Sequence, residues 1–275
     1  MNYIRQSAGL GGFAMVALLA TSLQTQAATV ATPAAGDIFL GFRASGGQGA
    51  SVSYLVNIGS DLTYRNASPG SSFDVLGIGD IGADLVATYG NNWFNRSDLS
   101  WGLFGTRASV SSTVYASREQ NPAGTVSAPW TALGATARNG TSSAISAVIS
   151  EIGGYTGSTS TTNSAVATLQ ANSTASSSYY KQVATDGTTD FGSLSQWSSI
   201  EGSFGGGAGG TALDLFRLAT SGTSHVGTFC IGNTGTLHFA APAAVPEPAV
   251  TALLGGLALV GLRRKRGISL ATATV

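Results

Sequence analysis

The residues whose spacing comes closest to a known chemical site are Gly77, Gly79 and Gly82, which form a G-x-G-x-x-G pattern. After a strand and before a helix, this pattern places a dinucleotide pyrophosphate on the helix N-terminus. The chain contains 38 glycines, and a second match lies within the glycine-rich stretch 202–210. The sequence also has no succession of strand-helix-strand units. We therefore expect no nucleotide site and no cofactor.

Histidine and cysteine are rare in this chain. His225, Cys230 and His238 could converge on neighbouring strands as metal ligands, but their spacing matches no zinc pattern. A Ser-His-Asp hydrolase would need one of these histidines beside a serine, and the G-x-S-x-G elbow is absent. Cys230 cannot form an intrachain disulfide because it is the only cysteine, and its neighbours TFCIG predict a buried strand thiol. No metal ligand and no catalytic residue are expected.

Two pairs of carboxylates have a spacing that could serve binding or acid-base chemistry. Asp186 and Asp190, in DGTTD, could ligate calcium, but the ligand order and terminal glutamate of an EF-hand loop are missing, so a turn is favoured. Asp80 and Asp84 lie one helical turn apart and are interpreted as a solvated helix face rather than a glycosidase pair.

Five aromatic residues could stack on sugar rings, because flat apolar rings complement the C–H faces of carbohydrates. They are Trp93, Phe94, Trp101, Trp130 and Trp197. Core packing is the favoured interpretation for each, and carbohydrate stacking stays open as the alternative.

The composition excludes one broad class of function. Charged residues make up 9% of the chain, against about 25% in average globular proteins. The basic residues form no stripe along the central part of the chain, so no nucleic-acid surface is expected. Arg5 and a C-terminal cluster lie in the terminal segments, whereas all 13 acidic residues lie between Ala28 and Pro248. The central region is therefore net acidic.

The elements that would position these residues are predicted to be mainly strands. Short apolar or alternating runs bounded by glycine, serine and threonine occur at residues 37–43, 51–58, 99–106, 113–117, 212–218, 225–231 and 235–239. The first two would form a hairpin across residues 44–50. An antiparallel β-sandwich or a curled sheet is favoured.

Two or three short helices are expected within this frame. Ile145, Val148, Ile149 and Ile152 follow helical spacing after a cap at Thr141 or Ser142. A shorter helix is predicted over residues 81–89. Residues 155–178 are rich in serine, threonine and glycine, with a helical patch at 165–170, and 202–210 is a glycine-rich loop.

The N-terminus has the pattern of a secretory signal peptide. Arg5 supplies the positive charge, residues 10–20 form a short apolar run, and small residues precede a cleavage point between Ala27 and Ala28. Residues 1–27 are therefore expected to be removed after export through the Sec machinery.

A second apolar segment begins at Ala249 and ends at Leu262, directly before Arg263, Arg264, Lys265 and Arg266. As a helix it spans about 21 Å, less than the roughly 30 Å hydrocarbon core. Snorkelling of the long basic side chains extends its reach. The segment predicts a single, marginal transmembrane helix. The basic cluster would hold its end in the cytoplasm and leave the body outside.

Immediately before this segment lies the sequence Val245-Pro246-Glu247-Pro248. The two prolines fix an extended backbone around one carboxylate, which a processing enzyme could recognise. The order of this motif, a short apolar helix with paired glycines and a basic cluster resembles the PEP-CTERM sorting domain. The resemblance covers residues 245–266. It implies recognition by an exosortase, a membrane-embedded peptidase, and delivery of the body to the cell surface or to an exopolysaccharide matrix.

These features divide the chain into a signal peptide at 1–27, a β-rich extracytoplasmic passenger domain at 28–241, and a sorting segment at 242–275. The leading hypothesis is a non-enzymatic surface or biofilm-matrix protein of a bacterium. It would be anchored transiently in the inner membrane, then processed and associated with exopolysaccharide. A secreted glycan-binding module is the alternative, and a secreted hydrolase acting through His225 or His238 is the third.

Overall fold

One antiparallel sheet is built from the apolar runs of the central region. The computed structural model describes residues 33–108, 112–154, 167–184, 190–194, 199–204 and 211–244. The strands are β1 (Asp37–Ala44), β2 (Val52–Ser60), β3 (Ser72–Asp74), β4 (Leu99–Arg107), β5 (Thr113–Glu119), β6 (Ala167–Ala171), β7 (Glu201–Ser203), β8 (Leu213–Ala219), β9 (Gly222–Ile231) and β10 (Leu237–Ala240). The helices are α1 (Asp61–Arg65), α2 (Ile81–Tyr89), α3 (Ala135–Gly154) and α4 (Tyr179–Ala184), with a 3-10 turn at Trp93–Asn95.

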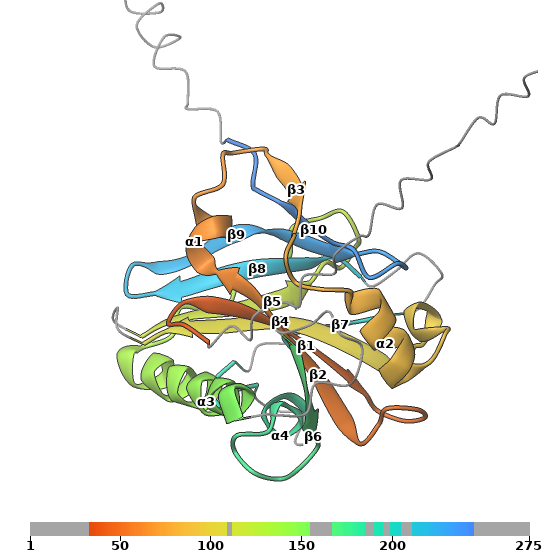
Figure 1. Cartoon of the computed structure of the whole chain (residues 1–275). Helices are drawn as coiled ribbons and strands as arrows, with labels where there is room; N and C mark the ends of the chain where they lie inside the picture. The colour runs from red at the N-terminus through yellow and green to blue at the C-terminus, as the bar shows by residue number, and fades with distance from the viewer. Residues whose placement is uncertain are drawn as a thin grey trace, which may run out of the picture.

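The strand order is β3-β10-β9-β8-β5-β4-β1-β2-β6, and β7 pairs separately with β4. The sheet curls around one of its faces (Figure 1). The prediction of a mainly β chain is thus confirmed. Of the two architectures considered, the curled sheet is observed instead of the sandwich, because all described strands join one continuous sheet. The predicted hairpin of β1 and β2 is also confirmed, with Leu40 opposite Val56.

Most central strands are buried on both faces. In β1, Ile38, Leu40 and Phe42 contribute to one hydrophobic cluster, while Phe39 contributes to a second cluster on the opposite face. A sheet covered on both sides needs apolar side chains at successive positions, which explains why the strand runs read as continuous apolar stretches.

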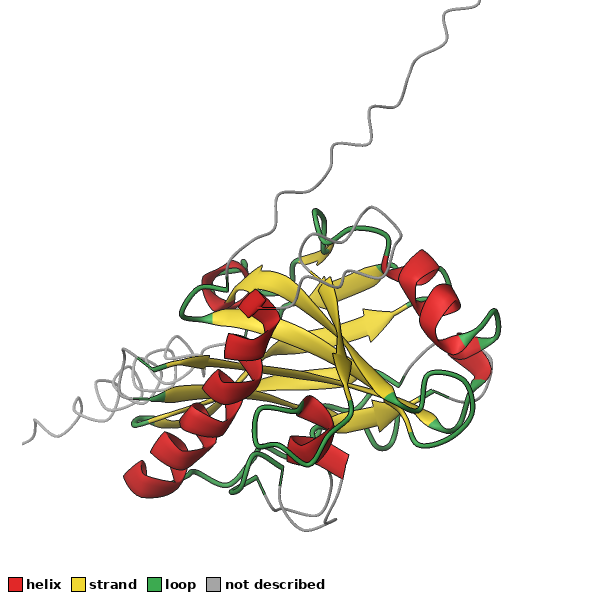
Figure 2. Ribbon diagram, turned by 60° about the horizontal axis from the view of Figure 1, so that its bottom comes forward, coloured by secondary structure: helices red, strands yellow, loops and turns green. Residues whose placement is uncertain are grey.

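Helices cover the two faces separately, as Figures 1 and 2 show. On the face of the first cluster, Tyr64 of α1 and Leu85 of α2 pack against the strands. On the opposite face, Ile145 and Val148 of α3 pack with Tyr179 of α4. The sheet therefore separates two cores.

The helix predictions were correct in type but incomplete. Helix α2 has the predicted bounds, and the side chain of Asp80 caps it by accepting from the Ala83 amide at 2.9 Å. Helix α3 begins at Ala135, so Thr141 and Ser142, the two predicted caps, both lie inside it. The hydroxyl of Ser142 instead lies 2.6 Å from that of Thr106 in β4. Helices α1 and α4 were not predicted, and the described residues form four α-helices where two or three were expected.

The expected helical patch at residues 165–170 is wrong. Part of that stretch forms β6, which pairs antiparallel with β2, Leu169 lying opposite Tyr54. The free edge of β2 provides the ladder of hydrogen bonds that decides the local conformation, so tertiary pairing overrides the local sequence preference.

The two outermost strands are short. At one edge β3 has three residues and ends at Asp74, and at the other edge β6 has five residues. Short edge strands offer few unpaired backbone groups to a neighbouring chain.

Both ends of the described body meet α1. The carbonyl of Gly36, just before β1, accepts from the amide of Asp61 at 2.7 Å. After β10, the chain passes α1 at Pro242 and Ala244, which line a cavity together with Tyr64. The strand register places the turn between β9 and β10 at the opposite end of the sheet, level with Ala44.

The predicted terminal segments lie outside the described residues. These are the signal peptide 1–27, the motif 245–248, the apolar segment 249–262 and the basic cluster 263–266. Among the residues that the structure describes, no helix combines the length and apolar character needed to cross a membrane.

Helix α4 approaches the sheet over a pair of glycines. Gly41 of β1 and Gly102 of β4 lie opposite each other, and the ring of Tyr179 covers both. A Cβ atom at Gly41 would lie 2.4 Å from Cζ of Tyr179, and one at Gly102 would lie 3.1 Å from its hydroxyl oxygen. The ring therefore fits only because both strands lack a side chain here.

We expect Gly41→Ala to lower the free energy of unfolding by about 1–3 kcal/mol, because overpacking forces the Tyr179 ring or the strand to shift. Chemical denaturation measures the change. In Gly41→Ala combined with Tyr179→Ala, the clash is relieved, so the combined loss should be smaller than the sum of the single losses.

Gly140 of α3 provides the matched control, since nothing lies within 4 Å of a Cβ atom placed there. Gly140→Ala should leave stability unchanged or raise it by up to about 1 kcal/mol, as expected for alanine in a helix. Equal losses in Gly41→Ala and Gly140→Ala would contradict the packing argument.

Candidate functional site

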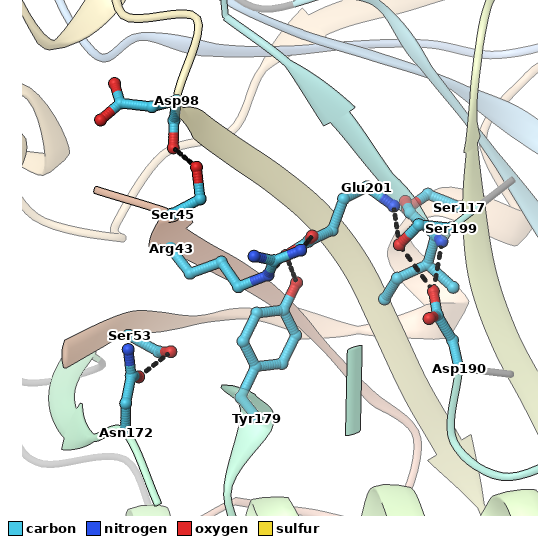
Figure 3. Close-up of polar contacts among 11 residues, drawn as sticks. Arg43, Ser45, Ser53, Asp98, Ser117, Asn172, Tyr179, Asp190, Ser199 and Glu201 are labelled. Atoms are coloured by element: carbon cyan, nitrogen blue, oxygen red, sulfur yellow. Dashed lines mark hydrogen bonds and ion pairs between the residues drawn. The ribbon is translucent and has the colours of Figure 1, made fainter. Parts of the chain in front are cut away.

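One buried polar group joins three elements that are distant in sequence. Arg43 comes from β1, Glu201 from β7 and Tyr179 from α4 (Figure 3). Oε1 of Glu201 accepts from Nε of Arg43 at 3.1 Å and from the Tyr179 hydroxyl at 2.9 Å. Its Oε2 lies 2.6 Å from Nη2 of Arg43, an ion-pair contact without hydrogen-bond alignment.

Burial dominates the electrostatics of this group. The side chain of Glu201 is 3% exposed. Loss of water raises its pKa to about 7, and the positive charge of Arg43 and the hydroxyl of Tyr179 offset part of that rise. Burial and the nearby carboxylate of Glu201 also raise the pKa of Tyr179 well above its usual value. Tyr179 therefore stays a hydrogen-bond donor at neutral pH.

A second set of contacts fixes the backbone on either side of Glu201. Oδ2 of Asp190 accepts from the Ile200 amide at 2.6 Å and from the Ser199 hydroxyl at 2.7 Å. The Ser117 hydroxyl of β5 donates to the Ile200 carbonyl at 2.6 Å. These bonds hold β7 beside β4, with Glu201 opposite Gly102. Asp190, predicted to lie in a turn or a calcium site, thus has a structural role.

Glu201 has a pKa suited to proton transfer at neutral pH, but its oxygens are occupied by Arg43 and Tyr179. General acid-base chemistry also requires that a substrate reach the group. The cavity beside α1 described above and the cavity at residues 74–82 described below are lined by other residues. We therefore assign the Arg43–Glu201–Tyr179 group to holding β7 and α4 on the sheet.

Asp214 of β8 forms a second buried centre. Its carboxylate accepts from Nε2 of Gln120 at 2.8 Å, the Thr228 hydroxyl at 2.6 Å, and the amide and hydroxyl of Ser127 at 2.6 and 2.9 Å. Burial raises its pKa, but His225 and these donors outweigh burial and lower it to about 2. The centre fixes the segment after β5 against the sheet.

A third centre, Asp61, ties the start of α1 to the sheet. Its buried carboxylate accepts from the guanidinium of Arg107 and from the hydroxyl of Tyr115. Asp37, the first residue of β1, accepts from Asn57 of β2 at 2.8 Å in the same region. Together these contacts close the end of the sheet where β1 begins.

The structure does not bring the histidines and the cysteine into a site. Nε2 of His225 lies 3.3 Å from Oδ1 of Asp214 without hydrogen-bond alignment. The hydroxyl of Ser127 donates to the Asp214 carboxylate directly, so the histidine does not connect the serine to the aspartate. Nδ1 of His238 lies 2.9 Å from Oδ1 of Asp74. Among the described residues, no group of three or more metal-ligating side chains is found.

Two expectations about exposure are wrong. Cys230 is exposed, because it alternates along β9 with the buried Phe229 and Ile231 and so points to the opposite face of the strand. Asp84 is buried and accepts from the Tyr54 hydroxyl, whereas Asp80, its predicted companion on a solvated face, is exposed.

The aromatic residues are placed mainly in the core. Trp93, Trp101 and Trp130 are buried, and Phe94 is half-buried with its ring edge-on to Trp93. The core interpretation is confirmed for the three tryptophans. Trp197 and Asp186 lie outside the described residues.

The glycine pattern contributes to an open cavity of about 660 Å³. Residues 74–82 and 234–237 line it. Gly77 and Gly79 have φ angles of +77° and +81°, which favour glycine, and Gly82 lies in the first turn of α2. The strand before the pattern, β3, is an antiparallel edge strand and not part of a parallel strand-helix-strand unit.

The buried ionic centres were missed by sequence reasoning. Arg43 and Glu201 are 158 positions apart, so no local pattern connects them. One signal was present, since Arg43 and Asp214 each interrupt an apolar strand run. A charge in a run that is buried on both faces needs an internal partner.

Comparisons of this chain with protein-family models, with curated proteins and with solved structures gave no match.

The raised pKa of Glu201 predicts that the free energy of unfolding declines as the pH rises. Its pKa is about 7 when folded and 4.5 when unperturbed, so the folded state binds the proton more tightly between these values. The contribution of Glu201 to the free energy of unfolding should therefore fall by up to about 3 kcal/mol as the pH rises through this interval. Urea denaturation between pH 4 and 8 measures the slope.

In Glu201→Gln this slope should disappear, whereas Glu151→Gln, at an exposed position of α3, should keep it. Parallel profiles for Glu201→Gln and the unsubstituted protein would show that Glu201 does not carry the pH dependence.

The lowered pKa of Asp214 predicts the opposite trend in acid, where the free energy of unfolding should decline as the pH falls. Its pKa falls from 3.8 to about 2 on folding, so the stabilisation is present above pH 4 and is lost as the pH falls toward 2. The contribution is up to about 2 kcal/mol. Asp214→Asn should flatten the unfolding profile below pH 4, and Glu201→Gln should retain it there. An unchanged acid profile in Asp214→Asn would refute this assignment.

Proposed function

We propose that this chain is an exported envelope or extracellular-matrix protein that is sorted through its C-terminal segment. The observation that carries the proposal is the order of three features: the motif Val245-Pro246-Glu247-Pro248, the apolar segment 249–262 and the basic cluster 263–266. The resemblance of this segment to the PEP-CTERM sorting domain names an exosortase as the processing partner.

In this proposal the signal peptide 1–27 directs export, and the segment 249–262 anchors the body in the inner membrane as a transient transmembrane helix. Arg263 to Arg266 keep the far end of that helix in the cytoplasm. Glu247 provides the charge that the peptidase recognises, and Pro246 and Pro248 keep the strand extended. Processing then releases the β-rich body to the cell surface or the matrix.

The body is suited to such a role in two respects. Pro242 and Ala244 run alongside α1 toward the proposed motif, so the tether leaves from one end of the sheet. The ionic centres at Asp61, Glu201 and Asp214 are engaged in contacts within the fold. These contacts support a structural rather than a catalytic role for the buried charges.

A glycan-binding module is the second candidate, and the observation that favours it is the open cavity at residues 74–82. The three buried tryptophans do not contribute to this candidate. A hydrolase acting through His225 or His238 has less support, because neither histidine is hydrogen-bonded to a serine within the described part of the chain.

Mass spectrometry of the C-terminal peptide in the native host tests the sorting proposal. Protein recovered from the culture medium and the envelope should end at or near residues 245–248. The intact tail through Val275 in the envelope would instead indicate a permanent anchor, and the sorting proposal would fail.

Glu247→Ala should leave the unprocessed chain in the membrane fraction, because the peptidase loses the charge it recognises. Glu151→Ala, which removes an exposed carboxylate from α3, is the matched control and should be processed normally. Normal processing of both variants would show that the peptidase does not recognise the Glu247 carboxylate.

A further inference from the structure

The cavity at residues 74–82 is held open by a contact between two backbones. A Cβ atom at Gly82 would lie 2.1 Å from the Thr234 carbonyl oxygen, and one at Gly235 would lie 2.2 Å from the Gly82 nitrogen. The start of α2 is thereby fixed against the turn between β9 and β10. The cavity of about 660 Å³ between these segments is within the size range of small-ligand sites.

Hydrogen-bond acceptors face this cavity from two sides. Asp74 and Asp80 are among its lining residues. Asp80 uses Oδ1 to cap α2, and Asp74 uses Oδ1 to contact His238, so each carboxylate has a second oxygen for a ligand. The hydroxyls of Thr234 and Thr236, 3.0 Å apart, add groups that can both donate and accept.

Donors come from the backbone of the same segment. Within the described part of the chain, the amides of residues 76–79 donate to no other residue, whereas the preceding amide, that of Val75, donates to the Leu237 carbonyl at 2.8 Å. Amides and carboxylates side by side complement a ligand whose hydroxyls both donate and accept.

The cavity also has an apolar part. Leu76 is 85% exposed, more than the other exposed large hydrophobic residues of the described chain, and it lines the cavity with Val75 and Ile78. A single exposed leucine is ordinary on a protein surface. Here it adjoins open donors and acceptors, and this combination of apolar and polar faces matches the C–H and O–H faces of a sugar ring.

Charge narrows the class of ligand. The lining contains two carboxylates and no lysine or arginine, so phosphates and acidic sugars are repelled. No cluster of three metal-ligating side chains occurs among the described residues. A neutral ligand rich in hydroxyls remains the best match.

We propose that this cavity binds a neutral saccharide unit of an extracellular polysaccharide. The proposal rests on the function proposed above and names the matrix partner. The cavity lies at the end of the sheet opposite to α1, where the chain leaves toward its tether.

Isothermal titration of the full chain in detergent tests the proposal. The probes are neutral oligosaccharides from glucans, mannans and galactans, with trigalacturonate, inorganic phosphate and calcium chloride for comparison. At least one neutral oligosaccharide should bind, and the anionic probes should not. Leu76→Ser and Asp80→Asn should each weaken that binding about tenfold or more, as expected for loss of a contact near 1.5 kcal/mol. Asparagine preserves the cap of α2.

Val126→Ser, at a residue that is 53% exposed and outside this cavity, is the matched control and should bind as the unsubstituted protein does. Absence of binding across the neutral panel, or binding unchanged in both cavity variants, would overturn the proposal. Binding of calcium alone that Asp80→Asn abolishes would also overturn it. None of these results depends on C-terminal processing, so this proposal and the sorting proposal can fail separately.

Discussion

The contact between Arg43 and Glu201 connects the first strand of the sheet to a segment that follows it by 158 positions. Tyr179 completes the group from α4, and it reaches Glu201 only because Gly41 and Gly102 leave room for its ring. These contacts link β7 and α4 to β1, in addition to the backbone pairing of β7 with β4 and the bonds from Asp190 and Ser117. Burying the pair has a cost, since both charges lose water. The pKa of Glu201 remains raised because burial outweighs the opposing contributions of Arg43 and Tyr179.

The same constraint operates throughout the fold, because a sheet covered on both faces leaves little solvent for its charged residues. Asp61, Asp84 and Asp214 are buried as Glu201 is, and each has hydrogen-bond partners inside the protein. A chain with few charged residues uses many of them as fixed internal links. Many of the exposed residues in the described part of the chain are serine, threonine or glycine. The open cavity at residues 74–82 differs from these centres because its carboxylates retain oxygens that face the solvent.

Seven of the ten described strands were predicted from sequence because each of them is an apolar or alternating run bounded by glycine, serine or threonine, as β1 and β9 illustrate. The three-residue strands β3 and β7 were not predicted, since three residues are too few to show a pattern. Helix α2 was predictable because Ile81, Leu85 and Tyr89 share one face. Strand β6 and helix α4 were not, since β6 depends on pairing with β2 and α4 on the slot above Gly41. The exposure of individual side chains was harder to predict than the positions of strands and helices. Asp84 and Cys230 were misassigned because their burial depends on which faces the helices cover, and no local pattern shows that. The sorting signals stay predictions, since they lie outside the described residues.

The short outer strands limit edge-to-edge pairing between copies of the protein at high concentration. A surface protein accumulates at high local concentration, and sheets with long free edges can then pair edge to edge into fibres. Here β3 ends after three residues at the carboxylate of Asp74, and β6 extends for only five. Neighbouring copies therefore find little backbone to extend. Copies of the described body can therefore be concentrated without joining edge to edge, so any cohesion between them has to come from contacts other than strand pairing.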